Sequence, residues 1–449
     1  LKSLNVGKMD DAQLKELRAE VALLKQLDSP CIISLREVFE SESTICIILE
    51  HCSGKDLSQR AFTGGEPQIA HVLYQVLKGV AHCHKKKICH RDLKLENVMF
   101  VREDSDHIRI IDFGLSKVFG TVGESFRGQD EHNRIMKSLC GTVFYFAPEM
   151  LVDRCYSEKA DIWAVGVITH MLLVGSPPFQ GQSEEETVDK IKHSSEVSFD
   201  SPLWHGHVSP EARDFTSKLL CFNAKDRLSA VQALQHPFLA RVAEQNLNRL
   251  RSEDPALLVA VKESVLRFCT YPVLKQAALM IVVHRTDSKT MEKLHDLFLS
   301  LDRSGFGMLS VEDLQEFMCQ GEGSISPNEC RQVFDKINQD KSSYIDCMEF
   351  MSASIESVMM CTDDFWKVAF GHLDVDNSGG ISVEDVLDLL GAGFTESDAT
   401  QIMQTACEGQ GDTIGQEDFL RLMDQNNTPL PSLRRAVGSI SSSEGEDKL

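Results

Sequence analysis

The sequence lacks several features that would assign it to a special class of protein. No apolar run is long enough to cross a membrane, and the first residues show no secretory signal. The 14 cysteines include no CxxC pair, so we expect reduced, buried thiols in a cytoplasmic protein. There is no strong glycine or proline bias, and 42% hydrophobic with 25% charged residues is ordinary for a globular protein. A chain of 449 residues predicts two or three domains.

The net charge of −22 is distributed unevenly along the chain. Residues 1–240 carry 28 basic and 33 acidic side chains, a balance of −5, whereas residues 241–290 carry 8 and 5, a balance of +3. Residues 291–449 carry 10 and 30, a balance of −20. An acidic module of this size argues against nucleic acid or anionic lipid as its partner and suits cations or a basic peptide.

The acidic part repeats itself from about residue 292. Four loops, each flanked by helical apolar patterns, begin at Asp302, Asn338, Asp374 and Cys407, at spacings of 36, 36 and 33 residues. This period and the loop composition are typical of the EF-hand, in which a twelve-residue loop surrounds one hard cation with oxygen ligands.

The third loop, DVDNSGGISVED, has the most complete set of oxygen donors. A glycine, Gly379, occupies the sixth position, where the loop turns sharply, and Ile381 is expected to pair with a neighbouring loop. The predicted ligands are Asp374, Asp376, Ser378, the Gly380 carbonyl and Asp385. Because Asp385 is one methylene shorter than the usual glutamate, this site is expected to tolerate Mg²⁺ as well as Ca²⁺.

The second loop, NQDKSSYIDCME, is predicted to bind an ion despite Asn338 at its first position and Ser343 in place of the glycine. Its predicted ligands are Asn338, Asp340, Ser342, the Tyr344 carbonyl, Asp346 and Glu349. The first loop has Phe306 where an oxygen is expected, and whether it binds an ion stays open. The fourth loop begins with Cys407 and is predicted to be structural.

Ordered motifs for phosphoryl transfer occupy the first 240 residues. HRDLKLEN begins at His90, an Asp-Phe-Gly triplet begins at Asp112, and an Ala-Pro-Glu triplet ends at Glu149. Asp92 is suited to orient an acceptor hydroxyl and take its proton, and Lys94 to contact the transferring phosphate. DLKxxN at this point is typical of kinases that act on serine and threonine rather than on tyrosine.

Other residues of these motifs are suited to bind charged groups. Asn97 and Asp112 offer hard oxygens for Mg²⁺, and Arg91 is a cation that can receive a phosphorylated activation loop. With these motifs followed by EF-hands, residues 1–425 resemble the calcium-dependent (calmodulin-domain) protein kinase family. The resemblance implies ATP, Mg²⁺ and Ca²⁺ as cofactors, and protein substrates with a basic residue before the target Ser or Thr.

Matching the sequence to the family pattern assigns further roles. Lys2 corresponds to the lysine that holds the α- and β-phosphates of ATP, and Glu20 to its helix partner. Leu49 would be the gatekeeper before the hinge. The other residues that the resemblance places at the nucleotide or the cleft mouth are Glu50, Cys52, Asp56, Glu96, Asn97 and Asp112. It also implies that Asp161 bonds the catalytic-loop backbone and that Glu149 pairs with Arg227.

One element of the family pattern, the glycine-rich loop over the phosphates, would lie before Leu1. We therefore expect an N-terminally truncated sequence with an incomplete small lobe, weak or inactive by itself, and membrane anchoring stays open. A competing hypothesis is a calcium-binding scaffold that no longer catalyses. Retention of the complete set of catalytic residues favours the enzyme: Lys2, Glu20, Asp92, Lys94, Asn97 and Asp112.

The predicted fold class is α+β, a bilobal kinase fold followed by an all-α module of two paired EF-hands. The predicted boundaries are residues 1–240 for the kinase domain, 241–290 for junction helices broken at Pro272, 291–425 for the EF-hands and 426–449 for a disordered tail. The junction carries two apolar stripes, Leu257, Val261 and Val265, then Leu274, Ala277, Ala278 and Ile281. We expect it to inhibit the kinase until Ca²⁺ transfers it to the EF-hands.

Overall fold

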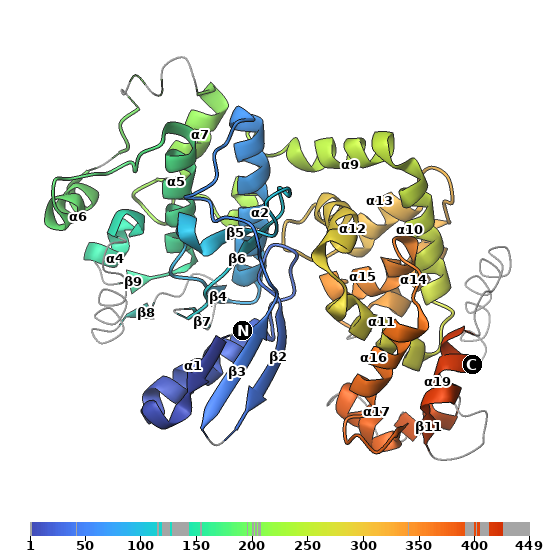
Figure 1. Ribbon diagram of the computed structural model, residues 1–449. Coiled ribbons are helices and arrows are strands. Elements are labelled where there is room, and N and C mark those ends of the chain that lie inside the picture. The colour runs from blue at the N-terminus through green and yellow to red at the C-terminus, as the bar shows by residue number, and fades with distance from the viewer. Residues whose placement is uncertain are drawn as a thin grey trace, which may run out of the picture. The chain divides into compact units, whose positions relative to one another are not determined.

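The chain divides into two compact units in a computed structural model. The first unit comprises Leu1–Gln245 with Ser304–Gly307, and the second comprises Asn246–Arg303 with Met308–Leu449 (Figure 1). The structure describes residues 2–41, 43–114, 116–118, 126–127, 143–152, 155–194, 196–199, 202, 204, 208–339, 341–390, 399–400, 402–404 and 413–424. Asp340, the fourth loop from Cys407 to Asp412 and the tail 426–449 lie outside the described residues.

The first unit begins with a small lobe made of a three-stranded antiparallel sheet and one helix. The strands β1 (Lys2–Asn5), β2 (Leu35–Glu40) and β3 (Thr44–Leu49) lie in the order β1-β3-β2. The helix α1 (Asp11–Leu24) begins at Asp10, whose carboxylate accepts a hydrogen bond from the Gln13 amide in a capping box. Leu17 of the helix packs on Ile45 and Ile47 of β3, which fixes α1 against the sheet.

The rest of the first unit is a mainly helical large lobe. Its two central helices, α2 (Gly65–Lys85) and α5 (Glu158–Val174), are buried on almost every side, which is typical of core helices. Around them lie α4 (Pro148–Val152), α6 (Glu184–His193), α7 (Pro210–Leu219) and α8 (Ala230–Leu234). Short strands β4 (Ile88–Cys89), β5 (Val98–Phe100), β6 (Ile108–Ile110) and β7 (Lys117–Val118) form two ladders beside the catalytic loop.

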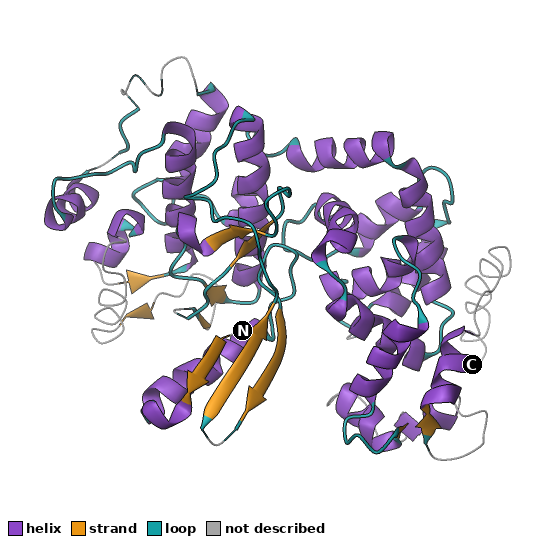
Figure 2. Cartoon of the chain, in the orientation of Figure 1, coloured by secondary structure: helices purple, strands orange, loops and turns teal. Residues whose placement is uncertain are grey.

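The second unit is almost wholly helical, as Figure 2 shows. It begins within α9 (Val242–Glu253), and the helices α10 (Pro255–Phe268) and α11 (Val273–Arg285) follow. The EF-hand helices follow as α12 (Ser288–Leu301), α13 (Val311–Met318), α14 (Pro327–Ile337), α15 (Cys347–Ser354), α16 (Asp363–Leu373), α17 (Val383–Leu390) and α19 (Gln416–Asp424). Consecutive hands pair through their loops: Leu309 bridges Ile345, and β10 (Gly380–Ile381) pairs with β11 (Ile414–Gly415).

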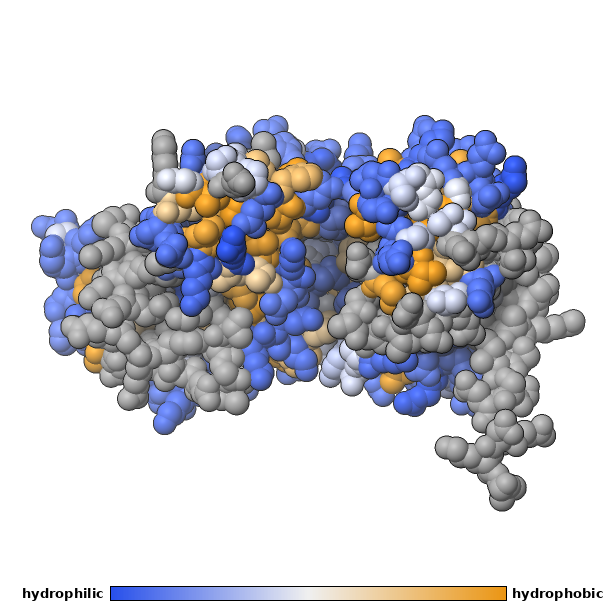
Figure 3. Space-filling view, turned by 90° about the horizontal axis from the view of Figure 1, so that it is seen from below, coloured by the Kyte–Doolittle hydropathy of each residue, from blue (hydrophilic) through white to orange (hydrophobic). Residues whose placement is uncertain are grey.

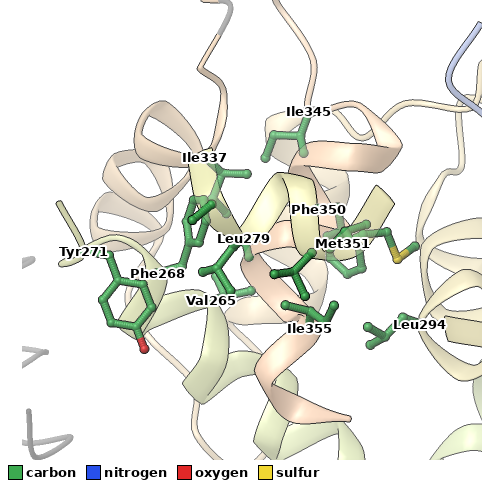
Figure 4. Close-up of a cluster of buried hydrophobic side chains, with 14 of the residues drawn as sticks. Val265, Phe268, Tyr271, Leu279, Leu294, Ile337, Ile345, Phe350, Met351 and Ile355 are labelled. Atoms are coloured by element: carbon green, nitrogen blue, oxygen red, sulfur yellow. The ribbon is translucent and has the colours of Figure 1, made fainter. Parts of the chain in front are cut away.

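The predicted junction shares one hydrophobic core with the EF-hand helices. Figure 4 shows Val265 and Phe268 of α10 and Leu279 of α11 in one cluster with Phe350 and Met351 of α15. The predicted break between the junction helices is present, because α10 ends at Phe268 and α11 begins after Pro272. The compact second unit therefore starts at Asn246 and includes most of the segment 241–290.

The described surface of the second unit is mostly hydrophilic, as expected when its apolar side chains are packed in the shared core. On the face in Figure 3, hydrophilic residues cover most of the described surface of the second unit and leave smaller apolar patches. Its exposed large hydrophobic side chains, among the described residues, are Val273, Met360, Val368 and Val375. No helix in the described ranges is long and apolar enough to cross a membrane.

Candidate active site and cation sites

The catalytic loop between β4 and β5 brings three of the predicted residues together. Lys94 Nζ lies 2.7 Å from Asp92 Oδ2, and Asn97 Nδ2 donates to the same oxygen at 2.9 Å. Asn97 also donates to the Asp92 carbonyl oxygen at 2.7 Å. Asp92 is 8% exposed, and its other carboxylate oxygen, Oδ1, accepts no hydrogen bond from the described residues. The Lys94 ammonium and the Asn97 amide thus orient the carboxylate through Oδ2 and leave Oδ1 available.

Asp161 of α5 fixes the backbone of this loop by hydrogen bonds. Its carboxylate accepts hydrogen bonds from the backbone amides of His90 at 3.0 Å and Arg91 at 2.9 Å, and from His84 Nε2 at 2.9 Å. Burial alone would raise the pKa of Asp161, but the hydrogen bond and charge of His84 and the other donors outweigh it, so its pKa is lowered. Arg91 has a φ of 70°, a left-handed conformation that Asp161 helps to maintain.

His90 links the catalytic loop to the Asp-Phe-Gly segment. Its Nε2 donates to the Ile111 carbonyl at 3.0 Å, while its Nδ1 accepts from the Asp92 amide at 3.3 Å. Burial lowers the pKa of His90, so the imidazole is neutral, as this pattern of one donor and one acceptor requires. Its ring meets that of Phe113 edge-on at 4.7 Å, and Phe113 is 1% exposed.

Asp112 itself is exposed and has a φ of 63°. Its carboxylate accepts only a 3.3 Å hydrogen bond from the Gly114 amide among the described contacts. A side chain at Gly114 would lie 3.2 Å from Asp112 Oδ1 and 3.7 Å from Glu20 Oε2, so this segment also reaches the α1 glutamate. Asp112 and the amide oxygen of Asn97 are hard donors of the type that Mg²⁺ prefers.

Lys2 and Glu20 form the ion pair that the family pattern implies. Lys2 Nζ lies 3.1 Å and 3.3 Å from the two carboxylate oxygens of Glu20. The antiparallel register of β1 and β3 places Lys2 opposite Ile47, and α1 carries Glu20 on its buried side. The Lys2 side chain is 44% exposed, so its ammonium can meet a phosphate as well as Glu20.

The hinge after β3 has a feature that the sequence analysis missed. The Glu50 side chain forms a buried two-point pair with Arg109 of β6, with distances of 2.8 Å to Nε and 3.0 Å to NH2. Arg109 also donates to the Pro30 carbonyl. The only available signal was a basic residue within the otherwise apolar stretch IRII at residues 108–111.

The hinge backbone keeps the groups that adenine would need. The Glu50 carbonyl and the Cys52 amide make no hydrogen bond within the described part of the chain. Burial raises the pKa of the Cys52 thiol to about 11, so this cysteine is a neutral wall residue rather than a nucleophile.

Two further carboxylates were predicted at the mouth of the cleft. Asp56 accepts hydrogen bonds from the Ser58 amide at 2.9 Å and from Gln59 Nε2 at 2.5 Å, so local donors already occupy part of its capacity. Glu96 is exposed, and no described side chain pairs with it. Glu96 therefore has the more available charge.

Glu149 and Arg227 form a second two-point ion pair, as the resemblance implies. Their distances are 2.8 Å and 3.0 Å, and Arg227 is 1% exposed. The guanidinium also lies 5.0 Å from the centre of the Trp163 ring. This pair anchors the end of the activation segment to the large lobe.

The third EF-hand loop gathers three carboxylates around one point. Oxygens of Asp374, Asp376 and Asp385 lie within 4.8 Å of one another, and no other such cluster of His, Cys, Asp or Glu occurs among the described residues. The Ser378 and Gly379 amides each donate to Asp374 at 2.9 Å. Gly379 has a φ of 90°, so the sixth position uses the conformational freedom of glycine. These three carboxylates and Ser378, four of the predicted ligands, thus lie together in a loop that fits a hard cation.

Asp385 closes this loop in the way a twelfth ligand does. It accepts from the Val375 amide at 2.9 Å and from the Ser382 amide at 2.8 Å. Burial would raise its pKa, but the hydrogen bonds from Ser382 and Val375 lower it, so the carboxylate is ionised.

The second loop is organised around Glu349. Its carboxylate accepts from the Gln339 amide at 2.7 Å and from the Asp346 amide at 3.0 Å, and Asp346 caps α15. The Ser342 hydroxyl donates to the Tyr344 carbonyl at 2.6 Å and lies 3.4 Å from Asn338 Oδ1. The described ligands of this loop therefore lie together, while Asp340 is outside the described residues.

The first loop brings Asp302 and Asp313 close together without the central oxygen. Burial, and then the charge of Asp302, raises the pKa of Asp313 against the hydrogen bonds from Ser310. Asp302 is 1% exposed and Asp313 is 6% exposed. In the fourth loop the described part includes Ile414, which pairs with Ile381, as was expected of Ile381 in the third loop.

Comparisons with known proteins agree with both parts of the chain. The protein kinase domain model matches residues 1–239, and the EF-hand domain pair model matches residues 291–355. Calcium-dependent protein kinase 17 of Arabidopsis thaliana is 30% identical over 433 residues, 94% of this chain and 78% of that protein. Calcium-dependent protein kinase 5 of Plasmodium falciparum (isolate 3D7) is 29% identical over 423 residues, 91% of this chain and 70% of that protein.

Among solved structures, the twitchin kinase region of C. elegans matches with a TM-score of 0.47 and 29% identity, over 53% of this chain and 41% of that one. The predicted α+β kinase fold with a helical EF-hand region is confirmed by the family models, and so is the predicted serine/threonine kinase activity. The kinase domain implies ATP as a cofactor, and the EF-hands imply Ca²⁺. The chain therefore belongs to the calcium-dependent protein kinase family and is a calcium-regulated serine/threonine protein kinase.

Proposed function

We propose that Asp92 is the group that receives the proton of the substrate hydroxyl when this kinase transfers the γ-phosphate of ATP. The observation that supports this role is the free Oδ1 of Asp92, beside an Oδ2 that Lys94 and Asn97 hold by hydrogen bonds. As the hydroxyl oxygen forms its bond to the γ-phosphorus, the bond from phosphorus to the bridging oxygen of ADP breaks. The hydroxyl proton passes to Asp92 Oδ1.

The other residues position the phosphates. Lys94 lies beside Asp92 and can also donate to the transferring phosphoryl group, while Lys2, oriented by Glu20, binds the α- and β-phosphates. Asn97 and Asp112 would hold Mg²⁺, which when bound neutralises charge on the phosphate oxygens. The backbone of Glu50 and Cys52 contacts adenine, with Asp56 near the ribose.

The test of the catalytic role is Asp92→Asn. The substitution preserves the shape of the side chain but removes its basicity, so kcat should fall by about 100-fold or more, in the range of general-base catalysis. Asp104→Asn, at an exposed carboxylate that pairs only with Arg102, is the matched control and should leave kcat unchanged. An Asp92→Asn enzyme that retains a tenth of the wild-type kcat would show that the role belongs elsewhere.

We also propose that the kinase prefers a basic residue, most often Arg, three positions before the target Ser or Thr. The supporting observation is Glu96, an exposed carboxylate with no described partner, which follows Asp92 in the same catalytic loop. Asp56 adds a second negative charge, although Ser58 and Gln59 share its hydrogen-bonding capacity. A charge-assisted hydrogen bond of this kind contributes about 1.5–3 kcal/mol.

For the EF-hands we propose two tight Ca²⁺ sites, at the second and third loops. The third site is supported by the carboxylate cluster of Asp374, Asp376 and Asp385, and the second by the convergence of Asn338, Ser342 and Glu349. The complete proposed ligand set is Asn338, Asp340, Ser342, Tyr344, Asp346 and Glu349 in the second loop and Asp374, Asp376, Ser378, Gly380 and Asp385 in the third.

Finally, we propose that the junction at about residues 241–290 inhibits the kinase without Ca²⁺ and is held by the EF-hand module when Ca²⁺ binds. Two features support this switch. The junction carries a net charge of +3 next to a module of −20. Its apolar residues Val261 and Val265 are fully buried in a core that they share with α15, so the EF-hand module has a complementary surface for them.

A further inference from the structure

Two of the three lysines in the junction are buried in the second unit. Lys262 of α10 is 5% exposed and Lys275 of α11 is 4% exposed. The third, Lys289, is exposed and makes no described side-chain contact. A buried ammonium is costly unless protein groups replace its water, so the two buried lysines need a structural reason.

Each buried lysine donates hydrogen bonds to backbone carbonyls near the end of a helix that follows an EF-hand loop. Lys262 Nζ donates to the Gln320 carbonyl and, at 3.2 Å, to the Glu322 carbonyl, in the turn after α13. Lys275 Nζ donates to the Met423 carbonyl in the last turn of α19. The Met423 carbonyl is in the last turn of α19, where carbonyls lack partners within the helix and carry partial negative charge. The Gln320 and Glu322 carbonyls lie just beyond the end of α13, and they too are acceptors that suit a cation.

Aromatic rings complete both sites. Lys262 Nζ lies 5.2 Å from the centre of the Phe317 ring on α13. Lys275 Nζ lies 4.3 Å from the Tyr271 ring and 5.8 Å from the Trp366 ring on α16. Burial lowers the pKa of both lysines. The carbonyls and ring faces therefore provide the solvation of these charges.

The helix α10 contacts both helices of the first EF-hand through charged groups. Asp254, which caps α10, lies 2.5 Å from Lys293 of α12, the helix before the first loop. Lys262 reaches the turn after α13, the helix behind the same loop. Ca²⁺ binding to sensor EF-hands changes the angle between these two helices. A change in this angle would alter the distance between the two contacts that α10 spans.

We propose that Lys262 and Lys275 are positioning residues that clamp the junction to the Ca²⁺-loaded EF-hand module, by binding the helix ends of the first and fourth hands. The proposal rests on the junction switch described above and deepens it. It assigns the recognition of the EF-hand state to two ammonium groups, while the apolar stripes supply contact area that is less sensitive to helix angle. Through Lys275, the fourth hand takes part in this recognition although its loop was not predicted to bind an ion.

The test uses the full chain with Lys262→Met, Lys275→Met and the control Lys289→Met. Methionine preserves the packing of the side-chain stem but removes the ammonium. In saturating Ca²⁺, hydrogen–deuterium exchange of α10 should accelerate about tenfold in Lys262→Met, and that of α11 in Lys275→Met, within the usual range of coupling between sites. The Ca²⁺ concentration at half-maximal kinase activity should rise about fivefold in each, with the activity of the fully activated enzyme unchanged.

The outcomes separate this proposal from the switch itself. Exchange and half-activation that match the Lys289→Met control would overturn the clamp. Faster exchange with unchanged Ca²⁺ activation would retain the clamp but show that the junction does not control the kinase. If a methionine variant fails to fold, Lys→Gln at the same position, which keeps a donor but shortens its reach, should shift exchange in the same direction by a smaller factor.

Discussion

Lys2 Nζ lies 3.1 Å from Glu20 Oε1, which joins the first strand of the small lobe to the face of α1. The pair depends on the position of a whole helix, because residues 18 positions apart meet only when α1 packs on the sheet. Gly114 of the large lobe approaches the same carboxylate, since a Cβ at this position would lie 3.7 Å from Glu20 Oε2. The pair therefore reports whether the two lobes have a geometry competent for catalysis.

Replacing Lys2 with methionine should lower kcat/KM for ATP by about 100-fold or more, the range observed when one preorganised electrostatic donor is removed. Glu20→Gln should give a smaller loss of the same kind, because the ammonium remains but is no longer oriented. Steady-state kinetics with varied ATP measure both effects. Lys15→Met, at an exposed lysine on the same helix as Glu20, is the control. Equal losses in Lys15→Met and Lys2→Met would exclude a specific role for the pair.

Charge reversal at Glu96 should remove the preference for a basic residue in the substrate. In a peptide library, Glu96→Lys should lower the selection of Arg three positions before the target by about tenfold. The reason is that the lost charge-assisted hydrogen bond contributes about 1.5–3 kcal/mol. Glu103→Lys, at an exposed glutamate of the same lobe, should leave the selection unchanged. A wild-type enzyme without any basic preference would contradict the proposed substrate class.

Glu50→Gln should destabilise the kinase domain in a pH-dependent manner. Burial would raise the pKa of Glu50, but the charge and hydrogen bonds of Arg109 lower it below the ordinary value of 4.5. The folded pKa is thus depressed, so the pair contributes stability above pH 4.5 that is lost as the pH falls through the folded pKa. Breaking a buried pair costs about 3–5 kcal/mol.

Urea unfolding of wild type and Glu50→Gln between pH 7 and pH 3 measures this effect. The difference in unfolding free energy should be largest near neutral pH and should shrink toward the acid limit. Glu103→Gln provides the comparison for a carboxylate that lies on the surface. A difference that does not depend on pH would mean that the lost shape, and not the ionised carboxylate, stabilises the hinge.

Asp374→Ala should remove one of two tight Ca²⁺ sites. Calorimetry on the whole chain should give a stoichiometry near two for wild type and near one for the variant, because Asp374 accepts the amides that shape the third loop and supplies a carboxylate to it. Asp363→Ala, on the exposed first turn of α16, should retain both sites. Four tight sites in wild type would contradict the assignment of ligands.

The sequence predicted the parts of the site that local patterns determine. Spacing within one loop was enough to place Asp92, Lys94 and Asn97 together, and the twelve-residue pattern did the same for Asp374 and Asp385. Each of these groups of residues lies within a single loop, so their proximity could be predicted without knowing any contact between distant segments.

Contacts between distant segments were not predictable in the same way. Glu50 and Arg109 are 59 positions apart, and either residue alone resembles an ordinary surface charge. In the sequence, Lys262 and Lys275 were visible only as part of the positive charge of the junction. The carbonyls to which they donate are 58 and 148 positions away, so their buried contacts could not be predicted. The apolar stripe through Val261 and Val265 was visible, whereas its packing against α15 required the tertiary structure.

The last prediction concerns the switch as a whole. The full-length kinase should be inactive without Ca²⁺ and active with it, whereas the same kinase ending at Ala240 should be active in both conditions because it lacks the junction. A chain ending at Arg285 retains the junction without the EF-hand core that buries Val261 and Val265, so it should stay inactive whether or not Ca²⁺ is present. A shift from 1% to 99% active requires about 5.5 kcal/mol of differential binding, which two sites with about hundredfold preferences supply.

Phosphorylation rates of the three chains on one peptide provide the measurement. Equal rates for the full chain with and without Ca²⁺ would reduce the junction to a tether, and Ca²⁺-dependence in the chain ending at Ala240 would place the sensor inside the kinase domain.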